Sequence, residues 1–157
     1  MNFTVFNNLV RVCAGGQTGV ERAALDWALT RRIGHSGWCP RGRLAEDGTI
    51  AARYQLRETQ TASLVEACAH NAIETDATLV LNTGELAGVA LAARQSAEQA
   101  HKPCLVLQLE GVDLAPLVDT VSDWMRAGGY TSLTIAGPQE SERPRIYRLS
   151  RLFLASV

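Results

Sequence analysis

The chain has 157 residues, of which 46% are hydrophobic and 20% charged, and its formal net charge is −1. This length and balance predict one globular domain over residues 1–157, with a hydrophobic core of its own. A charge so close to zero supplies no basic field for nucleic acid or for an anionic membrane surface, so we expect neither partner. The N-terminal residues lack the pattern of a signal peptide, and no apolar run is long enough to span a bilayer, so we expect a cytoplasmic protein.

Cysteine usage agrees with a reducing compartment. The four cysteines, at positions 13, 39, 68 and 104, form no C-x-x-C pair, and no histidine stands at zinc-ligand spacing from them. We therefore expect reduced thiols that mainly contribute to packing, and no metal site.

Residues 9–26, LVRVCAGGQTGVERAALD, predict a strand, a glycine turn and the start of a helix. The apolar run ends at Ala14, and Val20, Ala23, Ala24 and Trp27 then recur at helical spacing. The first N–H groups of such a helix have no partner within it and lie at the positive end of its dipole, which suits an anion such as phosphate. The alternative is a purely structural turn, because the pattern is neither a dinucleotide fingerprint nor a P-loop.

The rest of the chain alternates between strand and helix patterns. Strands are expected at residues 9–14, 35–39, 77–81, 104–109 and 131–136. Helices are expected at residues 20–32, 63–73, 86–97, 114–125 and 146–153. Residues 1–8 are expected to be a frayed lead-in, and residues 41–62 a long loop that is functional or flexible. The predicted fold class is α/β, with a mainly parallel sheet of five or more strands between helical layers.

In such sheets, ligands bind beyond the carboxyl ends of the strands. After the second strand, where an NAD-binding protein places an acidic residue, this chain has WCPRGR (38–43), which argues against an NAD site. Arg41 and Arg43 are candidates to clamp a second anion in bidentate fashion, or else they are solvated surface charge. Glu46 and Asp47 are suited to accept hydrogen bonds from the N–C–NH2 edge of a pterin or guanine, although they also fit a helix cap or an exposed turn.

Catalytic residues are not predicted. Three scattered histidines and the absence of a nucleophile elbow leave no positioned nucleophile–base pair.

Six strings together resemble the molybdenum carrier family, which includes the molybdenum cofactor carrier proteins, over nearly the whole chain. The strings are GGQTGVERAALD (15–26), GWCPRGRLAEDGTI (37–50), YQLRET (54–59), TDATLVL (75–81), HKPCLVL (101–107) and GPQESERPRIY (137–147). The resemblance implies a Rossmann-like three-layer α/β/α fold and a homo-oligomer. It also implies a carrier of molybdenum cofactor, or of a related phosphorylated pterin, that serves a molybdoenzyme or a cofactor-synthesis protein.

Carried over by position, the resemblance implies a set of ligand-binding residues. They are Gly15, Gly16, Gln17, Thr18 and Gly19 in the first turn, Arg41, Gly42, Arg43, Glu46 and Asp47 in the adjoining loop, Gly84 and Gly88 after the third strand, and Glu140 and Ser141 before the last helix. The chain departs from the family after the third strand, where G-x-L-[ST]-G-G-T is replaced by GELAGVA (84–90). This change removes hydroxyl donors and adds the bulk of Val89.

Two other functions stay open. One is a nucleotide or phosphoribosyl hydrolase of a related Rossmann-like family, although residues 84–90 lack the P-G-G-x-G-T-x-x-E turn of those enzymes. The other is a divergent family member that has lost the cofactor pocket and acts as an interaction module, which the altered residues Ala87, Val89 and Ala90 favour.

Overall fold

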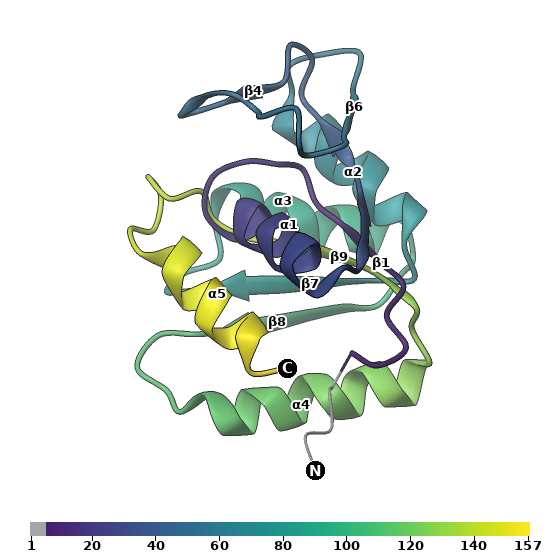
Figure 1. The fold of residues 1–157 in the computed structure, drawn as a ribbon, viewed down its shortest axis with the longest axis vertical. Coiled ribbons are helices and arrows are strands. Elements are labelled where there is room, and N and C mark those ends of the chain that lie inside the picture. Colours follow the sequence, from purple (N-terminus) through teal and green to yellow (C-terminus); the bar gives the residue numbers. More distant parts are fainter. Residues whose placement is uncertain (1–5) are drawn as a thin grey trace.

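The computed structural model describes residues 6–157, which form a parallel five-stranded sheet with helices on both faces (Figure 1). The strands are β1 (Arg11–Cys13), β2 (Gly34–Ser36), β7 (Ala77–Asn82), β8 (Cys104–Gln108) and β9 (Ser132–Ala136). Their order in the sheet is β2-β1-β9-β7-β8, and every pairing is parallel. All residues of β7 and β9 are buried, as expected for central strands covered on both faces. The predicted α/β class is confirmed.

Five helices form the two outer layers. They are α1 (Val20–Arg31), α2 (Leu64–Glu74), α3 (Gly88–Gln99), α4 (Leu114–Gly128) and α5 (Ile146–Ala155). Side chains of α1, α4 and α5 share one core cluster with Leu79 and Leu81 of β7. On the opposite face, α3 covers Val80, and α2 packs beside α3. Within residues 6–157, no helix is both long and apolar enough to cross a membrane.

The prediction of a frayed lead-in over residues 1–8 is wrong at Phe6. Residues 1–5 lie outside the described residues, but Phe6 is only 4% exposed, and its ring meets the Trp27 ring edge to face at 5.4 Å. The expected frayed lead-in is therefore part of the core at this position, because an aromatic pair buries a large apolar area.

The second predicted strand is interrupted at Gly37. A Cβ at Gly37 would lie 2.1 Å from the carbonyl oxygen of Ala14, so the chain passes too close to β1 for any side chain. Beyond this glycine, β3 (Trp38–Cys39) leaves the main sheet and pairs in parallel with β6 (Arg57–Glu58).

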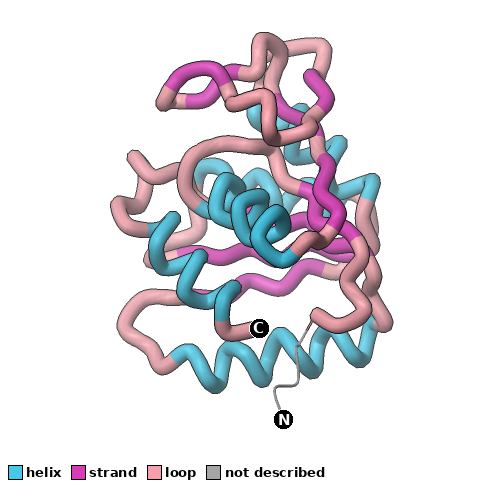
Figure 2. The backbone as a smooth tube through the Cα atoms, in the orientation of Figure 1, coloured by secondary structure: helices cyan, strands magenta, loops and turns pink. Residues whose placement is uncertain are grey.

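The long loop predicted for residues 41–62 is an ordered structure set apart from the main sheet, visible at the top of Figure 2. Together with Pro40, these residues form the 40–62 loop. It contains the small hairpin of β4 (Leu44–Ala45) and β5 (Gly48–Thr49). The Arg43 guanidinium lies inside it and donates to four backbone carbonyls, those of residues 50, 51, 54 and 56, at 2.8–3.3 Å. These bonds close the loop in place of a regular hydrogen-bond ladder.

Candidate functional site

Three turns meet beyond the carboxyl ends of β1, β7 and β9. A Cβ at Gly19 would lie 2.2 Å from the carbonyl oxygen of Pro138, and a Cβ at Gly137 would lie 2.2 Å from that of Leu81. Only glycine permits so close an approach of backbone to backbone. These glycines therefore bring the first turn, the end of β7 and the segment before α5 together at one edge.

One N–H group of the first turn, that of Gln17, is occupied by the chain's own carboxylate. Glu21 is 3% exposed and accepts the Gln17 N–H at 3.0 Å. The Val20 N–H donates to the Pro138 carbonyl at 3.2 Å. The side chains of residues 50 and 56 cover Gly16, where a Cβ would meet them at 2.7–3.1 Å. An external anion at the Gln17 N–H would therefore have to displace Glu21.

Burial determines the titration of this carboxyl group. Desolvation raises the pKa of Glu21 to about 7 and outweighs the Gln17 N–H and the Arg22 charge, which lower it. The nearby Glu142 carboxylate raises the pKa further by like-charge repulsion. Glu21 therefore titrates near neutral pH.

Four predicted site residues form one hydrogen-bond network across the edge. The Glu46 carboxylate accepts the hydroxyls of Thr18 and Ser141 and the Ser141 N–H, the last at 3.1 Å. The Thr18 hydroxyl also accepts the Glu140 N–H at 3.1 Å. These hydrogen bonds lower the pKa of Glu46, so the carboxylate form fastens the loop to the first turn and to the start of α5.

Beside this network lies a pocket of about 390 Å³ between α1, the 40–62 loop and the start of α5. Its lining residues are Thr18, Gly19, Arg22, Asp26, Asp47, Arg53, Tyr54, Glu140 and Tyr147. Thr18, Gly19, Asp47 and Glu140 were predicted. Reasoning from the sequence missed Arg22 and Asp26, although their spacing of four residues places both on the polar face of α1.

The predicted carboxylates of the pocket also hold the chain together. Asp47 pairs with the Arg22 guanidinium through two contacts of 3.0 and 3.2 Å, and this pairing lowers the pKa of Asp47. Glu140 accepts the N–H groups of Arg145 and Tyr147 at 2.6 and 3.0 Å and so caps α5. Each carboxylate therefore fixes one wall of the pocket.

The floor of the pocket contains an aspartate bound by two phenols. Tyr54 and Tyr147 donate to separate oxygens of Asp26 at 2.5 and 2.6 Å. Burial raises the pKa of both tyrosines, and the hydrogen bond to Asp26 raises it further. Both phenols therefore stay protonated and act as donors. The sequence analysis did not predict Tyr147 as a site residue. Tyr147 is the last residue of GPQESERPRIY (137–147), so its position in this string was the signal that could have identified it.

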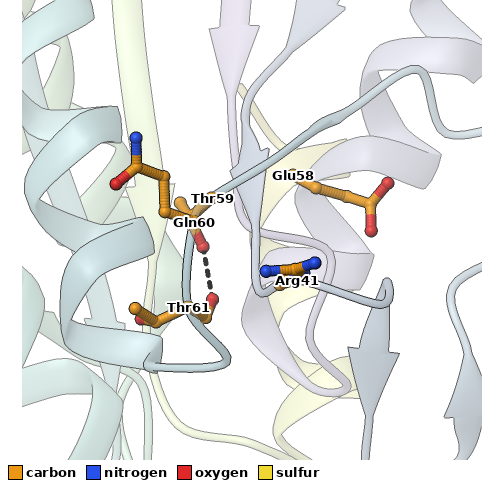
Figure 3. Close-up of a pocket in the computed structure, with 5 residues that line it drawn as sticks. All are labelled: Arg41, Glu58, Thr59, Gln60 and Thr61. Atoms are coloured by element: carbon orange, nitrogen blue, oxygen red, sulfur yellow. Dashed lines mark hydrogen bonds between the residues drawn. The ribbon is translucent and has the colours of Figure 1, made fainter.

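The two arginines predicted as a clamp do not converge. Arg43 is turned into its own loop, whereas Arg41 lines a separate open pocket of about 580 Å³ with residues 58–61 (Figure 3). In that pocket Glu58 accepts the Gly42 N–H at 2.7 Å, and the Thr59 hydroxyl donates to the Thr61 carbonyl at 2.8 Å.

The predicted glycines after β7 are also covered. The Arg143 guanidinium donates to the carbonyls of Thr83 and Glu85 at 2.8 and 3.1 Å, on either side of Gly84. A Cβ at Gly88 would lie 2.2 Å from a Glu142 carboxylate oxygen. This turn is therefore closed by side chains of the segment before α5, and it does not line the 390 Å³ pocket.

All four cysteines are free, and only Cys104 is more than marginally exposed. Among residues 6–157, no group of three or more His, Cys, Asp or Glu side chains is arranged to hold a metal ion.

Comparison with known proteins agrees with this architecture. No curated protein matches the chain. A crystal structure of a putative molybdenum carrier protein from Syntrophus aciditrophicus SB is similar to it, with a TM-score of 0.92 and 34% sequence identity. The similarity covers 95% of this chain and 94% of that one. Residues 12–157 match the circularly permutated YpsA SLOG family. The chain therefore belongs to the circularly permutated YpsA SLOG family.

Proposed function

We propose that this protein is a carrier that binds molybdenum cofactor, or a related phosphorylated pterin, in the 390 Å³ pocket. The observation that carries the proposal is the convergence of predicted residues from three distant segments, Thr18, Asp47 and Glu140, on one pocket that also holds two arginines and two tyrosines. The similar protein from Syntrophus aciditrophicus, described as a putative molybdenum carrier, supports the choice of ligand.

The pocket suits a flat polar heterocycle in size and chemistry. Its volume of about 390 Å³ lies within the range of small-molecule sites. Tyr147 offers an aromatic surface at the wall. The Asp47 side chain is 51% exposed beside Arg22, so lone pairs of its carboxylate stay open to the N–C–NH2 edge of a pterin.

The sequence predicts that the anionic end of the ligand binds at the first glycine turn, and the position proposed here differs from that prediction. Because Glu21 occupies the Gln17 N–H, we place the phosphate at the arginine side of the pocket rather than on the glycine turn. A homo-oligomer and delivery to a molybdoenzyme or a cofactor-synthesis protein remain part of the proposal, supported by the family resemblance.

The test is a calorimetric titration of the purified protein with molybdenum cofactor under anaerobic conditions. We expect 1:1 binding, and we expect Asp47→Asn to weaken it about tenfold because one charge-assisted hydrogen bond is lost. Asp123→Asn is the matched control, since Asp123 is exposed on α4 and far from the pocket lining. No binding at high micromolar ligand would reject the function, and equal binding by both variants would reject the site.

A further inference from the structure

We infer that Arg53 and Arg151 form the clamp for the phosphomonoester group of the ligand. Neither residue belongs to the set predicted from the sequence. The inference rests on the proposed function, because it names the anion subsite of the same pocket.

Arg53 reaches the pocket from the 40–62 loop. Its Nη2 donates to the Tyr54 hydroxyl at 2.7 Å and lies 3.9 Å from one carboxylate oxygen of Asp26. The guanidinium also lies over the Tyr54 ring, 4.7 Å from its centre. The side chain is 67% exposed, so the group is positioned by the phenol and the ring while its outer N–H groups face solvent.

Arg151 reaches the same carboxylate from α5. Its Nη1 donates to the Tyr147 hydroxyl at 3.1 Å and lies 3.9 Å from the other oxygen of Asp26. Its side chain is 36% exposed. The two guanidinium groups therefore lie near different oxygens of one carboxylate, and each is hydrogen-bonded to one of the two tyrosines that bind it.

Asp26 is in contact with more positive than negative charge. Two guanidinium cations face this one carboxylate, and the phenols of Tyr54 and Tyr147 are neutral donors. Over the pocket as a whole, the carboxylates of Asp47 and Glu140 balance the remaining cations. A guanidinium has five N–H donors, and within residues 6–157 each of these two arginines uses only one in a hydrogen bond. Both therefore keep donor capacity for a ligand.

Two neighbouring arginines, Arg22 and Arg143, use their N–H donors within the chain. Arg22 donates to Asp47 and to the Gly16 carbonyl, and Arg143 binds the carbonyls that flank Gly84. Arg53 lines the pocket, and Arg151 contacts the lining residues Asp26 and Tyr147, so the two form a pair with spare donors beside one carboxylate. A phosphomonoester dianion matches these donors, because its oxygens accept bidentate hydrogen bonds from guanidinium groups.

The experiment compares a phosphorylated pterin with the same pterin lacking its phosphate. We expect the wild-type protein to prefer the phosphorylated form by about tenfold or more, and we expect Arg53→Gln and Arg151→Gln each to reduce this preference several-fold. The double variant is expected to bind both pterins equally. Arg126→Gln, at an exposed site on α4, is the matched control and is expected to keep the preference.

The outcomes separate the clamp from the proposed function. A double variant that retains the phosphate preference overturns the clamp and leaves the pterin site in place. If neither pterin binds, the proposed function fails, and the clamp is then tested with pyrophosphate alone on the wild-type protein. Pyrophosphate is expected to shift the NMR signals of the Arg53 and Arg151 Nε–H groups, and unchanged signals overturn the clamp.

Discussion

Replacing Glu21 by glutamine is expected to change how the free energy of unfolding depends on pH. In the folded protein, burial raises the pKa of Glu21 from 4.5 to about 7. Between these two values the folded state holds a proton that the unfolded chain has released. Stability therefore falls as pH rises through this interval and becomes independent of Glu21 above it. The difference between the two pKa values is equivalent to about 3 kcal/mol.

The interval between pH 5 and 7 isolates this carboxyl group from the others. Glu46, Asp47 and Asp76 have lowered pKa values, caused mainly by hydrogen bonds to their carboxylates. Their stabilising contribution is complete above about pH 4 to 5 and is lost as the pH falls through their folded pKa values. Titratable groups common to the wild-type protein and the variant cancel in the comparison.

The assay is urea unfolding at about pH 5, 6, 7 and 8. We expect the wild-type protein to lose about 2.5 kcal/mol over this range relative to Glu21→Gln, whose side chain cannot ionise. Glu110→Gln, on the exposed turn after β8, serves as control and is expected to follow the wild type. Parallel pH profiles for the wild-type protein and Glu21→Gln would refute the conclusion that burial raises the pKa of Glu21.

Three further substitutions test the packing that positions the site. Gly19→Ala is expected to cost about 3 kcal/mol or more in thermal unfolding, because φ is +81° and a Cβ would lie 2.2 Å from the Pro138 carbonyl; a smaller loss would show that the turn can relax. Phe6→Ala should cost about 3 kcal/mol in urea unfolding through lost packing on Trp27, and a neutral result would place Phe6 outside the core. Asp76→Ala should cost about 2 kcal/mol, because its carboxylate accepts two N–H groups at the start of β9 at 2.9 and 3.1 Å; unchanged unfolding at pH 7 would contradict this.

The main elements are predictable because their patterns are local. The buried runs of β7 and β9 and the helical spacing of α1 follow from side chains a few residues apart, and the observed elements lie close to the predicted ranges. The 40–62 loop has no such period. One guanidinium, that of Arg43, holds it together by binding four carbonyls up to 13 residues away. A pattern of apolar spacing contains no information on such contacts.

For the site too, the sequence predicts the location but not which polar groups stay available to a ligand. The predicted location, the edge beyond the carboxyl ends of the strands, follows from the alternation of strands and helices. Which donors and acceptors stay open there depends on distant partners: Glu46 binds Ser141, and Asp47 binds Arg22. One signal was nevertheless present in the sequence. An acidic residue in the first turn of a helix, as Glu21 is, can reach back to the free N–H groups of that same turn.

The occupied glycine turn has a consequence for a carrier, which has to release its cargo as well as hold it. A phosphate at the buried turn of Glu21 would be shielded from solvent, and its release would require the 40–62 loop to open, because the side chains of Ile50 and Leu56 cover that turn. The Arg53 side chain is 67% exposed, so salt screens the attraction between its charge and a phosphate bound there. A competing surface of a partner protein can also reach this phosphate. Binding at the arginine side should therefore weaken steeply with ionic strength, whereas binding at the turn should not. A salt titration of affinity thus distinguishes the two placements without any substitution.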